Sequence, residues 1–237
     1  MKASETLIEH ASVAVPADGV VLRGDLSIPP ALQGVVLFAH GSGSSRKSPR
    51  NRYVAEVLND HSLGTLLIDL LTTEEEQEDQ ATGHWRFNID LLSHRLLAVT
   101  DWLTSPVQGT AHGIGLFGAS TGAAAALMAA AERPGVIKAV VSRGGRPDLA
   151  ESTASLVQAP TLLIVGGRDT AVLEMNRDAM RLMKCKTELQ IIPGATHLFE
   201  ERGALQGVAT LAADWFTTYL ATILDPTRQY RPWRRSC

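Results

Sequence analysis

Residues 113–131 read GIGLFGASTGAAAALMAAA, and this stretch decides the fold. Its first part, 113–119, is an apolar run of the length of a strand. Its last part belongs to a segment, 121–132, that is apolar on every side, and a helix of that kind has to be buried. We therefore predict a buried strand, a sharp turn at 118–122 and a buried helix.

Further apolar runs repeat the pattern of the first strand. Most of them are continuously apolar, which is typical of strands buried on both faces of a parallel sheet. Helical periodicity over 88–104 and 204–221 alternates with them, and two early runs at 11–15 and 20–28 indicate a hairpin. This order predicts an α/β protein with a doubly wound, mostly parallel sheet flanked by helices. The other predicted strands are 34–40, 64–70, 136–142, 160–167 and 187–194.

The composition is that of an ordinary globular protein. The chain has 237 residues, of which 45% are hydrophobic and 20% charged, with a net charge of −3. We expect one domain over 1–237, with a core at about 12–222 and a C-terminal tail at 223–237. The basic residues of the tail, within 228–237, are the one cluster of positive charge, so no nucleic-acid partner is expected.

Targeting and cysteine signals are weak. The first ten residues lack the pattern of a signal peptide, and the longest apolar block, 123–131, is too short to span a bilayer. Cys185 and Cys237 have no near partner in the sequence, so neither a disulfide framework nor a metal site is predicted. We expect a cytoplasmic protein with no membrane partner.

The turn at 118–122 reads Gly-Ala-Ser-Thr-Gly, which is the pattern of a nucleophile elbow between a strand and a helix. Such a turn is sharp and strained, and Gly118 and Gly122 would let the strand and the helix approach each other closely. The hydroxyl of Ser120 would then stand clear of the sheet as a nucleophile. The alternative is a serine that merely caps the helix.

A serine needs a base, and the base is oriented by an acid. In enzymes with this elbow, the acid and then the histidine follow the serine along the chain. Of the seven histidines, His197 is the one that follows Ser120. Asp169 comes directly after a predicted strand and two glycines, at the edge where His197 is expected; Asp148 is the alternative acid.

A second loop, within LFAHGSGSSRKSPR (37–50), also follows a predicted strand. Arg46 stands where a phosphate-binding loop and a dinucleotide-binding turn would each need a glycine. The loop fits better as the second arm of an oxyanion hole, in which the N–H group of Ser42 acts together with that of Thr121. Gly41 and Gly43 are the next candidates in this loop for contact with the substrate.

Three further features concern the surroundings of this site. Arg143 and Arg146 follow a predicted strand at the same edge, and one of them is expected to bind an anionic group of the substrate. A structural salt bridge is the alternative for both. The acidic segment 71–85, which carries EEEQED at 74–79, is expected to be a solvated loop, and 146–159 leaves room for only a small cap. His40 is expected to order its loop by hydrogen bonding.

Four motifs taken together resemble those of the α/β-hydrolase superfamily. They are HGSGS (40–44), GASTG (118–122), GGRD (166–169) and GATH (194–197). The resemblance covers about residues 12–222, and the small size without a large cap is similar to the dienelactone-hydrolase-like branch. Dienelactone hydrolases proper use a cysteine nucleophile, whereas this chain has Ser120, which favours carboxylic esters over lactones.

The resemblance implies a serine hydrolase that cleaves small carboxylic esters, or lactones or thioesters, through an acyl-enzyme on Ser120. It implies His197 as the base and Asp169 as the acid, with no metal and no organic cofactor. An acyltransferase or perhydrolase on the same site stays open, as does a binding module without catalysis. The expected partner is a small ester-type molecule, and a homodimer is left open.

Overall fold

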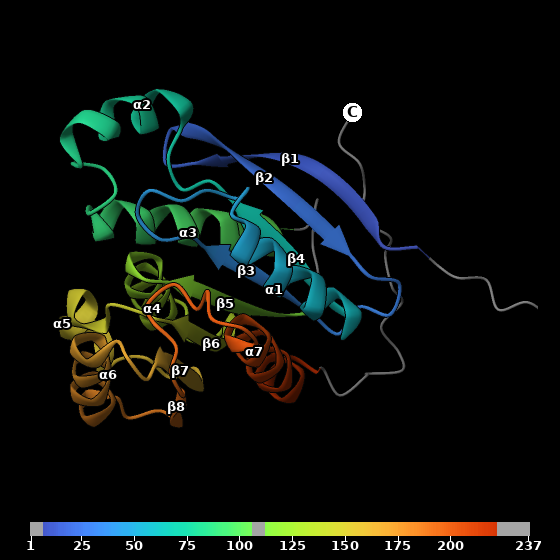
Figure 1. The fold of residues 1–237 in the computed structure, drawn as a ribbon. Helices are drawn as coiled ribbons and strands as arrows, with labels where there is room; N and C mark the ends of the chain where they lie inside the picture. The colour runs from blue at the N-terminus through green and yellow to red at the C-terminus, as the bar shows by residue number, and fades with distance from the viewer. Residues whose placement is uncertain (1–6, 106–111, 222–237) are drawn as a thin grey trace, which may run out of the picture.

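The computed structural model describes residues 7–105 and 112–221, which form one eight-stranded sheet with helices on both faces (Figure 1). The strand order is β1-β2-β4-β3-β5-β6-β7-β8. β1 pairs with β2 and β2 with β4 in antiparallel fashion, and all other neighbours are parallel. The strands are β1 (Glu9–Ala17), β2 (Val20–Ile28), β3 (Gly34–Ala39), β4 (Leu63–Ile68), β5 (Gly113–Ala119), β6 (Ile137–Arg143), β7 (Thr161–Gly166) and β8 (Thr187–Ile192).

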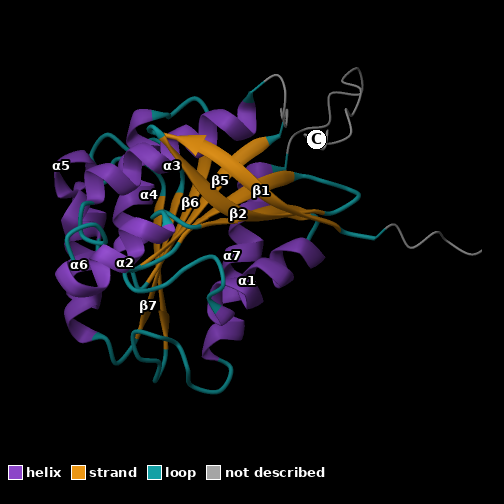
Figure 2. Ribbon diagram, turned by 90° about the horizontal axis from the view of Figure 1, so that it is seen from above, coloured by secondary structure: helices purple, strands orange, loops and turns teal. Residues whose placement is uncertain are grey.

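Two layers of helices cover the sheet (Figure 2). α1 and α7 pack together on one face, and α3, α4, α5 and α6 lie on the other, while α2 stands beside α3 at one end of the molecule. The doubly wound, mostly parallel sheet predicted from the sequence is confirmed. The helices are α1 (Pro49–Asp60), α2 (Thr73–Thr82), α3 (Ile89–Thr104), α4 (Thr121–Glu132), α5 (Glu151–Ala154), α6 (Thr170–Leu182) and α7 (Ala204–Leu220).

The central strands are buried from end to end. Every residue of β3, β4 and β7 is buried, because helices cover both sides of these strands. Phe38 and Phe117, on neighbouring strands, stack with ring centroids 4.8 Å apart under α7. Gly115 lets α7 approach β5 closely, since a Cβ at that position would lie 2.6 Å from the ring of Phe216.

The described part of the chain begins before the predicted core. β1 begins at Glu9, slightly before the expected start of the core, and Asp18 and Gly19 form its turn to β2 with φ values of 50° and 79°. The predicted C-terminal tail, 223–237, and Cys237 lie outside the described residues. No helix within 7–105 and 112–221 is long and apolar enough to cross a membrane.

The expectation of a loop over 71–85 is wrong, because residues 73–82 form α2. The helix begins with a capping box, in which the side chains of Thr72 and Glu75 each bind the backbone N–H of the other. Arg95 then holds Glu75 by two hydrogen bonds of 2.6 Å. Asp79 is the buried residue of α2, so the helix lacks the apolar stripe from which a helix is normally predicted.

The segment after β6 forms only a small cap, as predicted. It consists of a 3-10 turn over Pro147–Ala150 followed by the four-residue helix α5. The carboxyl edge of the sheet is therefore covered lightly on this side, and α2 forms the other part of its cover.

We predict that Gly122→Ala disrupts the junction between β3 and α4. A Cβ at Gly122 would lie 2.5 Å from the carbonyl oxygen of His40 and still nearer to that of Ala39, and backbone atoms cannot move aside. The substitution should lower the free energy of unfolding by about 3 kcal/mol, measured by urea denaturation. Gly135→Ala is the control, because no atom lies within 4 Å of its added Cβ. An equal loss in both variants would contradict this explanation.

Candidate active site

Ser120 lies at the turn between β5 and α4 with φ 51° and ψ −120°. A positive φ is strained for a residue with a side chain, and strain of this kind clusters at functional sites. The backbone holds it in place: Ser120 N–H donates to the carbonyl of Arg143, and its own carbonyl accepts from Arg146 N–H, each at 3.2 Å. The side chain makes no capping hydrogen bond to α4, which argues against a mere helix cap.

The turn is tight on both sides of the serine. A Cβ at Gly118 would lie 2.8 Å from the nitrogen of Ala123, inside the first turn of α4. Gly41, in the loop after β3, is also confined, since a Cβ there would lie 3.1 Å from the Cβ of Ser120. The structure therefore brings the two glycine-containing motifs into direct contact, as the prediction of an oxyanion-hole arm requires.

His197 and Asp169 meet at the same edge of the sheet. Asp169 directly precedes α6, and its Oδ2 lies 2.6 Å from Nδ1 of His197, in the loop after β8. The His197 side chain is 38% exposed and that of Asp169 is 18% exposed, so the imidazole is open to a ligand while the carboxylate is sheltered. A carboxylate in this position holds the ring in one orientation and one tautomer.

Asp148, the alternative acid, is engaged elsewhere. It accepts from Nε and Nη2 of Arg146 at 2.9 and 2.7 Å. These charge-assisted hydrogen bonds lower the pKa of Asp148 and raise that of Arg146. For Arg146 the structure thus shows the salt bridge that was the alternative to substrate binding.

The turn after β6 lies between the serine and the histidine. The backbone carbonyl of Arg143 accepts from Ser120 N–H, as described above. A Cβ at the next residue, Gly144, would lie 3.4 Å from the His197 ring. Gly144 has a φ of 52°, so the chain reverses against the face of this ring. No hydrogen bond joins the Ser120 hydroxyl to His197 within the described residues. The backbone of Ser120 and the ring of His197 border the same turn.

His40 orders the loop after β3, as the sequence predicts. Its Nε2 accepts from Leu70 N–H at 3.1 Å, so the ring is neutral and its Nδ1–H donates to the carbonyl of Gly41 at 3.0 Å. Burial lowers the pKa of His40, although the hydrogen bond to Gly41 and the nearby carboxylates oppose this. Arg46 adds a second tie, because its N–H donates to Asp69 at 2.7 Å and its guanidinium pairs with the same carboxylate.

The two predicted oxyanion-hole residues are neighbours. Ser42 N–H donates to the hydroxyl oxygen of Thr121 at 3.0 Å. The hydrogen bond places the loop of Ser42 against the N-terminus of α4, where backbone N–H groups favour negative charge. Gly43 comes next with a φ of 68°, which lets the loop turn away from the serine.

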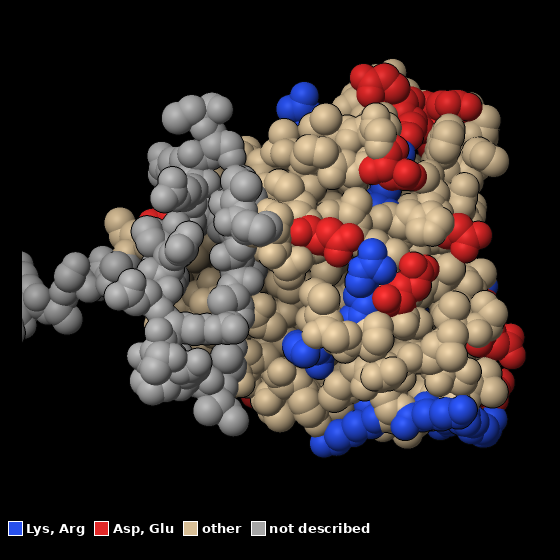
Figure 3. All heavy atoms as spheres, turned by 180° about the vertical axis from the view of Figure 1, so that it is seen from behind, with Lys and Arg blue, Asp and Glu red and all other residues tan. Residues whose placement is uncertain are grey.

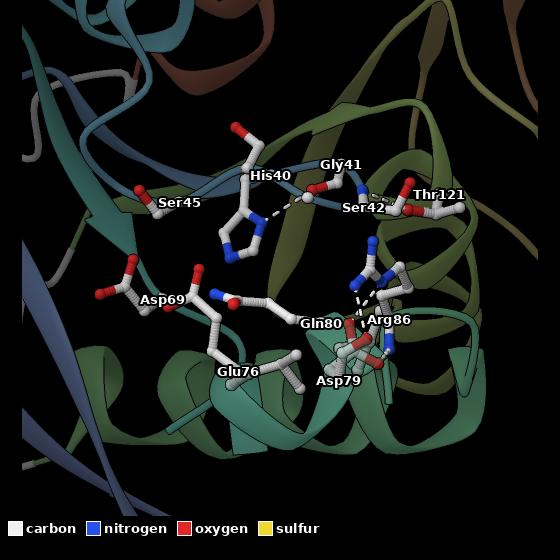
Figure 4. A pocket seen from close by; sticks show the side chains of 14 residues that line it. His40, Gly41, Ser42, Ser45, Asp69, Glu76, Asp79, Gln80, Arg86 and Thr121 are labelled. Atoms are coloured by element: carbon white, nitrogen blue, oxygen red, sulfur yellow. Dashed lines mark hydrogen bonds and ion pairs between the residues drawn. The ribbon is translucent and has the colours of Figure 1, made fainter. Parts of the chain in front are cut away.

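A cavity of about 150 Å³ lies between this loop and α2 (Figure 4). Residues of the 40–45 loop and Thr121 form one wall, and Glu76, Asp79 and Gln80 of α2 form the other. Arg86 closes it, with Nε paired to Asp79 and Nη2 donating to the Asp79 carbonyl at 2.6 Å. Burial alone would raise the pKa of Asp79, but hydrogen bonds from Arg86 and Trp85 outweigh it and lower that pKa. The capping-box pattern of Thr72 and Glu75 is the sequence feature that could have predicted the helix of this wall.

Among the described residues, no carboxylate forms an ion pair with the buried cation of Arg143. The residue is 8% exposed, and its Nε and Nη1 have no hydrogen-bond partner within the described residues. Burial lowers its pKa to about 10, assisted by the charge of Arg50, so it remains charged at neutral pH. Its guanidinium lies 5.8 Å from the ring centroid of Phe199, itself held at a strained φ of 57°.

Metal-ligating side chains do not gather in the part of the chain that the structure describes, where no three of them could hold one ion.

This fold and site define an α/β-hydrolase. A family model described as the dienelactone hydrolase family matches residues 50–222, and the chain belongs to this family. A crystal structure of a dienelactone hydrolase from Anabaena variabilis is 58% identical and superposes with a TM-score of 0.88 over 90% of this chain and 99% of that one. An esterase from Pyrococcus furiosus shares the fold, with a TM-score of 0.75 and 18% identity over 90% of this chain and 92% of that one.

Two Mycobacterium tuberculosis proteins, from strains CDC 1551 / Oshkosh and H37Rv, are 52% identical to this chain over 218 residues. Both carry the provisional name of a phosphoribosyl transferase. The match covers 92% of this chain and 48% of each relative, so the chain spans about half the length of the curated relatives it matches. That name therefore refers to proteins about twice as long as this chain.

We predict that His40 makes folding stability depend on pH. As pH falls below about 6.5, the unfolded chain takes up a proton on this ring that the folded chain, with its lowered pKa, does not. The free energy of unfolding should therefore fall on acidification, by up to about 1.4 kcal/mol per pH unit for this group. In His40→Gln the dependence between pH 7 and 5, measured by urea denaturation, should be shallower. Parallel curves for the two proteins would contradict the assignment.

Proposed function

We propose that this protein is a serine hydrolase that cleaves small carboxylic esters. The observation that carries the proposal is the 2.6 Å hydrogen bond between His197 and Asp169 at the sheet edge where Ser120 sits in a strained elbow. The elbow supplies the nucleophile and the histidine supplies the base, and their chain order is that of this class of enzyme.

In the proposed reaction, His197 Nε2 takes the proton of the Ser120 hydroxyl as its oxygen attacks the ester carbonyl carbon. Asp169 accepts from Nδ1–H, which keeps Nε2 free as the base and stabilises the imidazolium that forms. The imidazolium then gives its proton to the leaving alcohol oxygen as the carbon–oxygen bond breaks, which leaves an acyl group on Ser120. A water molecule then attacks the acyl carbon while His197 takes its proton. The bond to the Ser120 oxygen breaks, and the proton returns to that oxygen, which releases the acid and restores the serine.

The oxyanion of each tetrahedral intermediate is proposed to accept from the N–H groups of Thr121 and Ser42. Thr121 opens α4, so its N–H lies at the positive end of a helix. The N–H of Ser42 donates to the Thr121 hydroxyl in the structure, and an arriving oxyanion competes for that donor. Gly41 N–H is the alternative donor, since this residue lies against Ser120.

The alternative functions either pass the acyl group of the acyl-enzyme to another acceptor or form no acyl-enzyme. An acyltransferase or perhydrolase would use the same serine and pass the acyl group to an alcohol or peroxide instead of water. A binding module without catalysis is disfavoured by the strained serine, because such a conformation costs about 1–3 kcal/mol and tends to persist where function requires it. Water is the simplest acceptor because the His197 side chain is partly open to solvent.

We predict that Ser120→Ala abolishes turnover of 4-nitrophenyl esters and labelling by a fluorophosphonate probe. Removal of the nucleophile should lower kcat/KM by at least about 10³-fold. Labelling of the alanine variant at the level of the native protein would exclude Ser120 as the nucleophile.

We predict that Asp169→Asn lowers kcat by about 10³- to 10⁴-fold with little change in KM, because the amide no longer stabilises the correct tautomer or the imidazolium. Asp148→Asn is the matched control. Its carboxylate pairs with Arg146 and makes no hydrogen bond to His197 within the described residues, so the kcat of this variant should stay near that of the native protein. A larger loss in Asp148→Asn than in Asp169→Asn would reverse the assignment of the acid.

Arg143 is proposed to bind an anionic group of the substrate, because it is charged, buried and without an ion-pair partner in the described part of the chain, beside the turn that touches both Ser120 and His197. Arg143→Met should lower the ratio of kcat/KM for anionic over neutral esters by about 10- to 100-fold. Stability should hold or rise, because a buried unpaired charge is replaced by an apolar side chain. Arg146→Met, which removes a paired arginine, should leave the ratio unchanged. If the two variants have the same ratio of kcat/KM, Arg143 does not bind the anionic group of the substrate.

A further inference from the structure

The cavity between the 40–45 loop and α2 adjoins the reacting carbon of the proposed reaction. It is bordered by Ser42 and Thr121, the two residues proposed to hold the oxyanion. Gly41, also on its wall, lies against Ser120. A carbonyl carbon bonded to Ser120, with its oxygen between the two donors, therefore lies at the mouth of this cavity.

The sheet order decides which half of an ester points there. β5 carries Ser120; β3 and β4 lie on one side of it, and β6, β7 and β8 on the other. Asp169 and His197 come after β7 and β8, whereas the cavity lies beside the loops after β3 and β4. His197 has to protonate the leaving alcohol oxygen, so the alcohol lies on the β7–β8 side. The acyl group is then directed to the β3–β4 side, toward the cavity.

The walls of the cavity are polar. Leu71 and Leu92 are its apolar side chains among the described residues, and all the others carry polar groups or are glycines. Two of its carboxylates are already neutralised, since Asp69 pairs with Arg46 and Asp79 with Arg86. An alkyl chain would find little apolar surface here.

Three polar groups remain for a ligand. Glu76 and Gln80, on the exposed side of α2, make no side-chain hydrogen bond within the described residues, and neither does Nη1 of Arg86. This Nη1 would lie 3.9 Å from a Cβ at Gly43, so it faces the loop across the cavity. In Figure 4 the ends of Glu76 and Arg86 point from the α2 side toward the loop, and the Gln80 side chain extends in the direction of Glu76. Together they offer both acceptors and donors.

The cavity also limits the size of the group. It is small, with a volume of about 150 Å³. That space suits an acyl group of a few carbon atoms. Acidic side chains gather over the end of the molecule that α2 occupies (Figure 3), so this end of the surface favours a polar group over a long alkyl chain.

We propose that this cavity is the acyl-binding subsite and that it selects short acyl groups bearing a hydrogen-bonding substituent, such as a hydroxyl, over alkyl acyl groups. Glu76, Gln80 and Arg86 are the residues that would determine this specificity. The inference rests on the proposed esterase reaction at Ser120, because it concerns the acid half of the same substrate.

The test compares 4-nitrophenyl esters of acetate, butyrate, hexanoate and 3-hydroxybutyrate. In an apolar subsite, kcat/KM would rise about fourfold per methylene; here we expect no rise from acetate to hexanoate. The 3-hydroxybutyrate ester should exceed the butyrate ester by about tenfold. With the alcohol half constant, these differences report on the acyl group alone.

Gln80→Leu and Gln77→Leu form a matched pair of variants. Both replace an exposed glutamine of α2 by leucine, but Gln80 lines the cavity and Gln77 does not. Gln80→Leu should reduce the preference for 3-hydroxybutyrate over butyrate about tenfold and raise hexanoate turnover. Gln77→Leu should behave like the native protein.

The outcomes separate the two proposals. If Ser120→Ala hydrolyses the whole panel at the native rate, the esterase proposal fails and this inference fails with it. If hydrolysis depends on Ser120 but rises steadily with chain length, or if the two leucine variants do not differ, the inference is wrong and the esterase proposal stands.

Discussion

The close approach of three backbone segments around Ser120 is the constraint on which the rest of the site depends. The end of β3, the turn after β5 and the start of α4 meet with no room for a Cβ at Gly118 or Gly122 and little at Gly41. The strained φ of Ser120 is the result of that contact, and hydrogen bonds to the end of β6 hold it. Because the segments are locked together, the loop of Ser42 and the N-terminus of α4 share one position beside the serine.

Burial determines which charged groups around Ser120 need a partner of opposite charge. Asp69, Asp79 and Glu75 are each matched by an arginine, which stabilises the carboxylate against the cost of leaving water. Arg143 is the exception among the buried charges, since no acceptor within the described residues meets its Nε or Nη1. A ligand that carries negative charge would supply the counter-ion that the protein itself does not.

α2 differs from the other helices in the contacts that hold it. The large apolar clusters join the sheet to α1, α3, α4 and α7, whereas the one buried residue of α2 is a carboxylate. Its position depends on two polar anchors, Arg95 to Glu75 and Arg86 to Asp79. Elements held by few apolar contacts lie at the low-stability end of a structure. The wall of the cavity is thus the part of the site that can adapt most easily to a ligand.

The sequence by itself determined the sheet, its covering helices and the candidates for nucleophile and base, because buried strands and an elbow leave periodic and local signals. Apolar runs such as 34–40 and 160–167 had to be buried, and His197 was the one histidine after Ser120. Only the tertiary structure showed that Asp169 rather than Asp148 meets His197, and that Arg146 is paired while Arg143 is not. It also showed that the acidic helix over 73–82, which has a capping box but no apolar stripe, forms the wall of a cavity. These outcomes depend on contacts between residues far apart in the chain, which no local pattern encodes.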